Sequence, residues 1–364
     1  MDAVVSFEKV EFASRLLSWY DVSARDLPWR KDKTPYRIWV SEIMLQQTRV
    51  ETVIPYFERF LRAFPTIGSL AACDEEELHK LWEGLGYYRR AKHLKEAAIQ
   101  IMERHGGVFP SAKDDVEALK GIGAYTSGAI RSIAFEQKAA AVDGNVLRVF
   151  ARLTGEEGDI ADGAIKTKLT KQVEHLLPDR RNGDFTQALM ELGATVCLPN
   201  GLPRCEVCPF AADCVARKTD AIGSIPRKTK QATRRVESWT VFVLCAPDGR
   251  IHVNKRPKTG LLANLWEFDN APGRLSEREA KNHLEALEVS TRAIRRLPDR
   301  THVFSHIEWR MTAYRVDVAS AEVPEYGLWT SVLKLKEELS IPTAVRPYLE
   351  LSVEGNESAC YNSL

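Results

Sequence analysis

The sequence predicts two domains of different class: a mostly helical N-terminal domain followed by an α+β C-terminal domain. The chain has 364 residues, which is more than one compact core usually spans. Up to about residue 216, apolar residues recur at helical spacing. From residue 238 to about 352, short apolar runs separated by turn residues indicate strands. We therefore expect two separate hydrophobic cores.

The helices of the N-terminal domain are separated by glycine and proline residues, which interrupt helical hydrogen bonding. Phe12, Leu16 and Trp19–Tyr20 have the spacing of an amphipathic helix. The remaining helices are expected over 36–47, 75–83, 90–104, 125–135, 146–153 and 187–193.

The C-terminal domain begins near Ser238, where the pattern of apolar residues changes from helical spacing to short strand-like runs. Strands are expected over 240–246, 250–256, 301–309 and 311–318. Pro247–Asp248–Gly249 is a turn signal between the first two strands. A helix is expected to begin at Ser276, where Glu279 would complete a capping box.

Two segments are predicted to lie outside these domains. Residues 217–237 form a linker by composition, with seven Lys or Arg and one acidic residue between Arg217 and Arg235. The tail, residues 353–364, is predicted to be disordered. A basic linker is usually only a solvated segment, so its charge alone assigns no partner.

The composition is that of a globular protein, with 44% hydrophobic and 28% charged residues and a formal net charge of +1. This net charge does not exclude nucleic-acid binding, which depends on where the charges lie. We see no membrane-spanning stretch and no secretory signal at the N-terminus. We expect a cytoplasmic monomer, associated with the nucleoid in a bacterium, that binds no membrane. In such a compartment clustered cysteines indicate a metal rather than disulfides.

Four of the seven cysteines lie close together in the pattern C-x7-C-x2-C-x5-C: Cys197, Cys205, Cys208 and Cys214. Four thiolates at this spacing are the ligands that a tetrahedral zinc ion or an iron–sulfur cubane requires. Zinc ribbons usually pair two C-x2-C knuckles, and this segment has one. The spacing favours an iron–sulfur cluster modestly and leaves zinc open.

A Gly-x-Gly turn precedes a helix that is rich in small residues, in the segment LKGIGAYTSGAIRSIAF (119–135). Backbone N–H groups of Gly121 and Gly123 at a helix start would suit a DNA phosphate. A tight turn between two helices explains the same three residues equally well.

Two carboxylates could perform acid–base chemistry. Asp143 directly precedes the helix expected over 146–153, where it is either a simple helix cap or a carboxylate kept ionised and directed at positive charge. Glu42 is the only acidic residue of YRIWVSEIML and shares a face with Ile38 and Leu45. Burial would raise its pKa, although such a glutamate often reaches solvent at the edge of a stripe. Cleavage of a glycosidic bond needs one acid and one carboxylate.

Together, these features resemble the helix–hairpin–helix glycosylases that carry an iron–sulfur loop. Four strings resemble the MutY-type adenine DNA glycosylases within that superfamily: LPWR (27–30), SEIMLQQT (41–48), GLGYYRRA (84–91) and VDGNVLRV (142–149). TGLLANLWEF (259–268) and Phe304–Ser305–His306 resemble the NUDIX-like module of the same family. The resemblance implies a helical catalytic domain over 1–216 and a NUDIX-like domain over 238–352 that recognises 8-oxoguanine.

The resemblance implies that double-stranded DNA with an adenine paired to 8-oxoguanine, or to guanine, is the substrate. It makes Glu42 the acid that protonates adenine and Asp143 the carboxylate that stabilises the sugar cation, with Tyr125 and Asn145 as supports. The pocket for the flipped base would contain Arg25, Trp29 and Gln187. The wedge that fills the duplex and touches 8-oxoguanine would consist of Gln47, Thr48, Leu85, Gly86 and Tyr87. Phe304, Ser305 and His306 would reach the 8-oxoguanine, and the four cysteines would hold a 4Fe–4S cluster.

Three departures qualify the resemblance. Tyr125 stands where strand-nicking relatives carry a lysine nucleophile, and Lys120 replaces a usual proline without matching that position, so we predict a monofunctional hydrolase. No R-E-x-x-E-E stretch follows Gly260–Phe268, so the NUDIX-like module should recognise rather than hydrolyse. Seven residues instead of six separate Cys197 and Cys205, and Gly201 could absorb the insertion. The alternatives are a glycosylase-lyase acting on oxidised pyrimidines and a non-catalytic module that binds DNA lesions.

Overall fold

The computed structural model describes residues 7–229, 233–321 and 326–353. The chain divides into two compact units, the first formed by residues 1–72 and 92–231 and the second by residues 73–91 and 232–364. In the described ranges no helix is both long and apolar enough to cross a membrane. The disorder predicted for 353–364 falls outside the described residues, except at Val353, which ends a helix.

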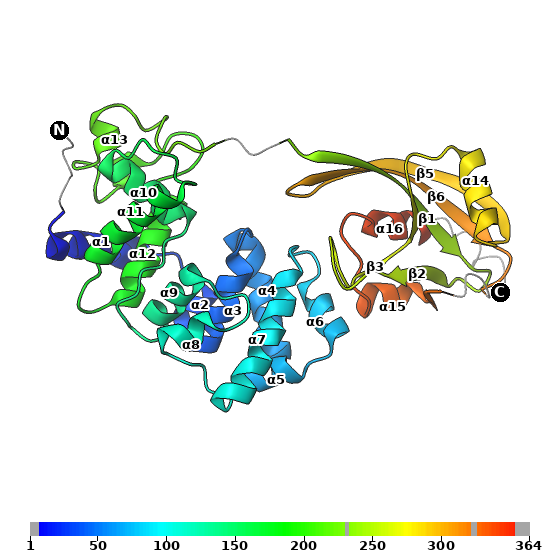
Figure 1. The fold of residues 1–364 in the computed structure, drawn as a ribbon, viewed down its shortest axis with the longest axis horizontal. Coiled ribbons are helices and arrows are strands. Elements are labelled where there is room, and N and C mark those ends of the chain that lie inside the picture. The colour runs from blue at the N-terminus through cyan, green and yellow to red at the C-terminus, as the bar shows by residue number, and fades with distance from the viewer. Residues whose placement is uncertain (1–6, 230–232, 322–325, 354–364) are drawn as a thin grey trace. The chain divides into compact units, whose positions relative to one another are not determined.

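The first unit is helical (Figure 1). Its elements are α1 (Lys9–Ser23), α2 (Pro28–Lys31), α3 (Pro35–Leu45), α4 (Val50–Ala63), α5 (Ile67–Ala72), α7 (Arg89–His105, entering from the second unit), α8 (Lys113–Glu117), α9 (Ala124–Ile133), α10 (Gly144–Thr154), α11 (Gly163–His175), α12 (Asn182–Thr195), the 3-10 turn η1 (Cys205–Val207) and α13 (Val215–Lys218). The mostly helical class expected for this part of the chain is confirmed.

One core of the first unit lies between α1, α10, α11 and α12 and extends to the cysteine-rich loop. Phe12 of α1 stacks on Phe210 of that loop, with ring centroids 4.2 Å apart. Phe150 and Phe185 add tilted contacts to the same ring. The loop is therefore anchored on the helical core by aromatic packing, in addition to whatever its cysteines bind.

Two substantial helices were not expected from the sequence. α4 contains Pro55, which ordinarily ends a helix. Its buried residues Val53, Phe57 and Phe60 nevertheless form a strong apolar stripe, and tertiary packing of that stripe outweighs the proline. α11 is mostly polar and lacks a clear apolar stripe. The Asp162 side chain caps its N-terminus, and two buried side chains attach it to the core.

The second unit combines a mixed sheet with helices (Figure 1). Its elements are α6 (Glu75–Trp82), β1 (Arg235–Cys245), β2 (Ile251–Lys255), β3 (Trp266–Glu267), β4 (Asp269–Pro272), α14 (Glu277–Ala286), β5 (Thr291–Val303), β6 (Ile307–Val318), β7 (Leu328–Thr330), α15 (Val332–Glu337) and α16 (Arg346–Val353). The α+β class expected for the C-terminal domain is confirmed, and so is the capping box of Ser276 and Glu279.

The sheet has the strand order β3-β2-β1-β6-β5, with β4 paired to β1 and β7 to β2. β1 and β6 run parallel, and the other pairs are antiparallel. One face of the sheet packs on α15 and α16, where Tyr348 is fully buried. The other face packs on α14 through Ala280 and Leu284. The sheet is thus covered on both faces.

One strand prediction was wrong. A single strand was expected over 301–309, but β5 ends at Val303 and β6 begins at Ile307. Phe304–Ser305–His306 is the turn of this hairpin, closed by a hydrogen bond from the Phe304 N–H to the Ile307 carbonyl (2.8 Å). Phe304 packs on Trp309, whereas Ser305 and His306 are exposed. Apolar side chains anchor the turn on both sides, and in the sequence they therefore look like parts of one continuous strand.

Candidate active site

A cavity of about 480 Å³ opens in the first unit, a volume that suits a small organic group such as a nucleobase. The four predicted catalytic residues and five of the predicted substrate-binding residues line it: Glu42, Tyr125, Asp143, Asn145, Arg25, Trp29, Gln47, Thr48 and Gln187. Five helices (α2, α3, α9, α10 and α12) and three segments between helices supply these side chains. The structure therefore brings together residues that are up to 162 positions apart in the sequence, from Arg25 to Gln187.

Glu42 lies on α3 and is only 5% exposed. Burial raises the pKa of its carboxyl to about 7; the hydrogen bond from Tyr125 acts in the opposite direction, and the charge of Asp143 adds to the rise. The Tyr125 hydroxyl donates to Glu42 Oε2 at 2.7 Å. Burial also raises the pKa of Tyr125 well above its ordinary value, so this hydroxyl stays protonated. Of the two sequence-based alternatives for Glu42, burial and contact with solvent at the edge of a stripe, the structure shows burial.

Asp143 is the N-cap of α10, as its position predicted. Its Oδ1 accepts from the Val146 N–H at 2.8 Å, and its Oδ2 accepts from the Asn145 amide at 2.7 Å. Burial nevertheless raises the pKa of Asp143, because the hydrogen bonds and the Arg148 charge only partly oppose the desolvation. The helix terminus holds this carboxylate in place, and its hydrogen bond lowers the pKa of Asp143 by less than burial raises it.

Arg148 connects Asn145 to the cysteine-rich loop. One guanidinium nitrogen, Nη2, donates to Asn145 Oδ1 and to the Gly193 carbonyl, both at 2.8 Å. Its Nε donates to the Cys197 carbonyl at 2.8 Å. Burial lowers the pKa of Arg148 from its ordinary value. The amide that orients Asp143 is therefore itself held by a buried, hydrogen-bonded guanidinium.

Sequence reasoning missed Glu191 and Arg30, which line the same cavity. Glu191 of α12 is 1% exposed and accepts from Arg25 (2.7 Å) and from Arg30 (2.7 Å). Burial would raise the pKa of Glu191, but the two guanidinium hydrogen bonds outweigh it and lower the pKa. The signal in the sequence was spacing: Glu191 follows Gln187 by one helical turn, and Arg30 directly follows Trp29.

The remaining predicted pocket residues are held in different ways. Trp29 is buried edge-on against Phe57, with centroids 5.5 Å apart. Gln187 is 4% exposed and donates to the Gly183 carbonyl at 3.3 Å. Gln47 is exposed and has a left-handed backbone, with φ at 58°. A positive φ is costly for glutamine, and such strain tends to occur at functional sites.

The other predicted wedge residues belong to the second unit. Leu85 is buried, Gly86 has φ at 71°, and Tyr87 is 45% exposed with φ at 49°. Arg90 fixes this turn by donating to the Leu85 and Gly86 carbonyls, each at 3.1 Å. The Tyr87 hydroxyl lies 2.5 Å from the Ser305 hydroxyl. The structure thus brings two separately predicted recognition segments into direct contact.

The glycine hairpin has the geometry that the sequence predicted. Gly121 has φ at 76°, and an added Cβ would lie 2.7 Å from the Cβ of His93, so a side chain is excluded there. Gly123 is the N-cap of α9. Both glycines are exposed, and the first N–H groups of a helix have no partner within it, which suits an anion.

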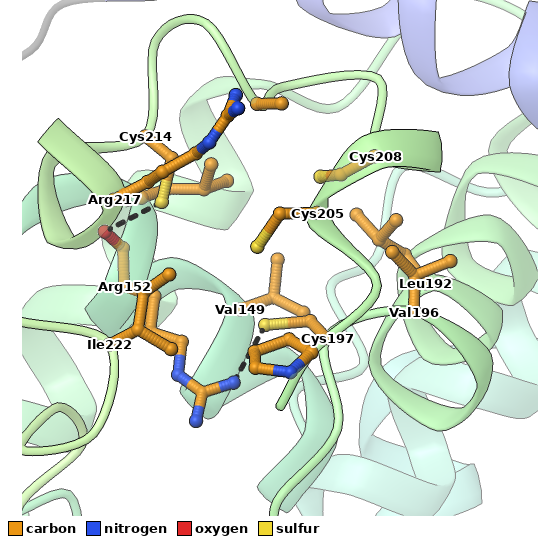
Figure 2. Close-up of a pocket in the computed structure, with 13 residues that line it drawn as sticks. Val149, Arg152, Leu192, Val196, Cys197, Cys205, Cys208, Cys214, Arg217 and Ile222 are labelled. Atoms are coloured by element: carbon orange, nitrogen blue, oxygen red, sulfur yellow. Dashed lines mark hydrogen bonds between the residues drawn. The ribbon is translucent and has the colours of Figure 1, made fainter. Parts of the chain in front are cut away.

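The four cysteines line one cavity in the first unit, together with apolar side chains of α10 and α12 (Figure 2). Burial raises the pKa of Cys208 to about 11, so a thiolate there requires a nearby cation. Arg152 Nη1 lies 3.3 Å from Cys197 Sγ. Within the described ranges, no three His, Cys, Asp or Glu side chains lie close enough to hold a single metal ion.

Two families match this chain. Residues 40–175 match the HhH-GPD superfamily base excision DNA repair protein family, and residues 240–351 match the NUDIX domain family. A solved thermostable thymine-DNA glycosylase is 29% identical and covers 58% of this chain and 97% of its own length, with a TM-score of 0.52. Endonuclease III trapped on DNA has a TM-score of 0.50 at 20% identity over 59% of this chain and 99% of its own, which shows the shared fold alone.

Curated proteins named adenine DNA glycosylase, from distantly related organisms, are similar to this chain. The adenine DNA glycosylase of Homo sapiens is 36% identical and covers 84% of this chain and 67% of its own length. That of Buchnera aphidicola subsp. Schizaphis graminum is 32% identical and covers 93% of this chain and 98% of its own length. Both matches extend over the helical and the sheet-containing parts. The chain belongs to the adenine DNA glycosylase family, DNA-binding hydrolases of N-glycosyl bonds that act in base excision repair.

Proposed function

We propose that this protein hydrolyses the N-glycosidic bond of adenine mispaired with 8-oxoguanine or guanine, after the adenine has rotated out of the duplex. The observation that carries the proposal is one cavity of base size that contains, besides the arginine-paired Glu191, two carboxyl groups of different environment, Glu42 and Asp143. A base must leave the stack before its glycosidic bond can be attacked.

Glu42 is proposed as the general acid. Its pKa of about 7 leaves a substantial fraction protonated at neutral pH, so it can give a proton to the departing base. The Tyr125 hydroxyl donates to Oε2, which favours the other oxygen, Oε1, as the site of the transferable proton. A protonated base is a far better leaving group than an anionic one.

Asp143 is proposed to stabilise the positively charged sugar. Its two oxygens are held by Val146 N–H and Asn145, so the carboxylate needs little reorganisation as charge develops. The glycosidic bond breaks and the base leaves with the proton that Glu42 supplied. Water then bonds to the sugar carbon and gives one proton to the Glu42 carboxylate, which restores the acid. The two carboxyl groups thus divide acid and electrostatic roles.

The reaction is proposed to stop at hydrolysis. Tyr125 occupies the position where a lysine would attack the sugar, and none of the described residues that line the cavity is a lysine. A lyase that acts on oxidised pyrimidines would need such an amine for a Schiff base. A module that only binds lesions would have no need of a buried carboxyl with a pKa near neutrality.

Recognition of 8-oxoguanine is proposed for the hairpin turn Phe304–His306 and the turn Leu85–Tyr87. Their contact through the Tyr87 and Ser305 hydroxyls supports a single recognition surface. The exposed Ser305 and His306 offer hydrogen-bonding groups beyond the packed Phe304. The Arg90 guanidinium lies over the ring of the half-exposed Tyr87, 5.5 Å from its centroid, and helps to hold that side chain.

Cys197, Cys205, Cys208 and Cys214 are proposed to hold a 4Fe–4S cluster. All four thiols line one largely apolar cavity beside the buried Arg152, which suits a group with several sulfur ligands. The residues present therefore fit a cluster, whose chemistry when bound is one-electron exchange and neutralisation of the thiolates. The cysteine cavity and the carboxylate cavity share no lining residue among those described, so no catalytic step involves the cluster.

A single-turnover assay tests the function with duplexes that pair adenine with 8-oxoguanine, guanine or cytosine. We expect excision opposite 8-oxoguanine and guanine, strand breaks only after alkali, and no adduct after borohydride. Asp143→Asn should lose at least roughly 100-fold in rate while it retains duplex binding, because a carboxylate that stabilises charge is removed.

Asp162→Asn is the matched control. Asp162 caps α11 as Asp143 caps α10, but it is exposed and lies outside the cavity. Asparagine caps a helix as well as aspartate, so both variants keep their helices. Full activity of Asp143→Asn, or an equal loss in Asp162→Asn, would refute the role of Asp143, and a borohydride adduct would refute monofunctional hydrolysis.

A further inference from the structure

Arg152 contacts the cysteine-rich loop at several points. Its Nη1 donates to Cys197 Sγ (3.3 Å) and to the Leu198 carbonyl (2.8 Å), and its Nε donates to the Ile225 carbonyl (2.8 Å). Its own carbonyl accepts from Cys214 Sγ at 3.3 Å. One residue of α10 therefore touches two of the four cysteines (Figure 2).

The charge of Arg152 lacks a carboxylate counterion. The side chain is 6% exposed, and within the described residues no Asp or Glu lies within ion-pair distance of it. Arg148, also buried, donates to the Cys197 carbonyl from the same helix without a carboxylate ion pair. A buried guanidinium without an anion is unfavourable by several kcal/mol, on the order of the ion desolvation cost. Such a charge next to a sulfur implies that the cysteine site carries net negative charge.

We propose that Arg152 is the counterion and hydrogen-bond donor of the group that the four cysteines hold. It stabilises Cys197 as a thiolate and fixes the loop and the Ile225 segment on α10. This inference rests on the proposed 4Fe–4S cluster. It assigns Arg152 as a positioning residue, since it acts through Cys197 and touches no reacting atom of the DNA.

The proposal has an electrochemical consequence. When the cluster takes up one electron from an electrode, no bond forms or breaks and the site gains one negative charge. A guanidinium directed at a ligand sulfur stabilises this reduced state more than the oxidised one. Hydrogen bonds to the sulfurs and the net charge are among the factors that set the potentials of such clusters. Arg152 therefore raises the reduction potential.

The test compares Arg152→Gln, Arg152→Lys and the control Arg217→Gln in the full-length protein. Arg217 lines the same cysteine cavity, but it is exposed, and within the described residues no hydrogen bond joins its guanidinium to a cysteine sulfur; only its backbone contacts Cys214. Both Gln variants remove one positive charge near the cysteines. Arg152→Gln also removes a hydrogen-bond donor to the Cys197 sulfur, whereas Arg217→Gln removes no such donor.

Iron and sulfide content, visible absorption and the midpoint potential on an electrode are measured for each variant. Arg152→Gln should shift the potential to more negative values and weaken cluster retention roughly 10- to 100-fold, as loss of a group that orients a metal ligand does. Arg152→Lys should fall between this variant and wild type, and Arg217→Gln should change little.

Two results would overturn the proposal. The first is an unchanged potential in a fully loaded Arg152→Gln or Arg152→Lys protein, and the second is an equal shift in Arg217→Gln. If Arg152→Gln loads no iron, the Arg152→Lys potential decides. A wild-type protein without iron and sulfide would instead refute the cluster itself. That outcome differs from a protein that holds the cluster but whose reduction potential does not depend on Arg152.

Discussion

At the scale of single residues, Glu42 is the group whose environment differs most from water. It is enclosed by α3 and by the Tyr125 side chain, and its carboxyl has a pKa of about 7 because burial disfavours the charged form. Asp143 in the same cavity also has a raised pKa, yet three hydrogen bonds, from Val146 and Asn145, and the charge of Arg148 oppose the rise. The two carboxyl groups therefore differ in the hydrogen-bond donors that contact them.

These shifts predict the pH dependence of excision. The rate should fall as the pH rises through about 7, because Glu42 loses the proton that the leaving base needs. It should fall again at acidic pH, where Asp143 becomes protonated and no longer stabilises positive charge. Single-turnover rates measured across this range give the profile.

Glu42→Gln is the variant that checks this assignment. It should lose roughly 10²- to 10⁴-fold in rate together with the alkaline limb of the profile. Wild-type Glu42 binds its proton more tightly folded than unfolded, so its burial lowers stability as the pH rises from 4.5 to about 7. Above pH 7 the variant should be more stable by up to about 3 kcal/mol, and below 4.5 the difference should vanish. A persisting alkaline limb would assign it to another group.

At the scale of elements, the close approach of α10 and α12 sets the position of Asn145. A Cβ added at Gly193 would lie 2.5 Å from the Asn145 Cβ and 3.1 Å from its backbone. The Gly193 carbonyl also accepts from Arg148, which holds Asn145. A glycine in mid-helix lowers helix propensity, and here it allows two helices to touch.

Gly193→Ala should therefore destabilise the helical unit by about 1 to 3 kcal/mol, the usual range for overpacking, and slow excision by displacing Asn145. Thermal unfolding followed by helical circular dichroism and the single-turnover rate measure both effects. The control is Gly163→Ala at the first position of α11, where an added Cβ meets nothing within 4 Å. That variant should be neutral or slightly stabilised. Equal stability of the two variants would contradict the packing argument.

At the scale of the whole molecule, the two compact units do not follow the linear order of the chain. Residues 73–91 lie within the helical part of the sequence but form a unit with residues 232–364. Glu83 of this segment accepts from the Ile341 N–H at 2.9 Å and forms an ion pair with Arg346. The proposed recognition turns, Leu85–Tyr87 and Phe304–His306, therefore belong to one unit.

Replacement of Ser305 and His306 together by alanine should reduce discrimination between 8-oxoguanine and guanine opposite adenine more than it slows excision opposite guanine. The double variant removes polar groups of the exposed turn and the partner of the Tyr87 hydroxyl, but leaves the carboxylate cavity untouched. The ratio of single-turnover rates on the two duplexes measures the effect. Thr301→Ala, at an exposed position of β5, is the control and should keep the wild-type ratio. An unchanged ratio in the double variant would show that the turn has only a structural role.

Sequence patterns alone predicted the two fold classes, six helices of the first unit (α1, α3, α7, α9, α10 and α12), the capping box at Ser276 and segments that line the cavity. Each of these follows from local periodicity, from capping residues or from long specific strings. The strand break at Phe304–His306 was missed because anchoring side chains on both sides of a turn look like one strand. α4 was missed because its buried stripe outweighs Pro55.

Only the tertiary structure decided that Glu42 is enclosed, that Glu191 holds Arg25 and Arg30, and that Arg152 points at Cys197. Each depends on partners more than 40 residues away in the chain. Burial and pairing of charge are properties of surroundings, which a one-dimensional pattern does not contain. Nine residues that line the cavity were therefore named from the sequence, whereas Glu191 and Arg30, and the protonation, pairing and orientation of the side chains, came from the fold.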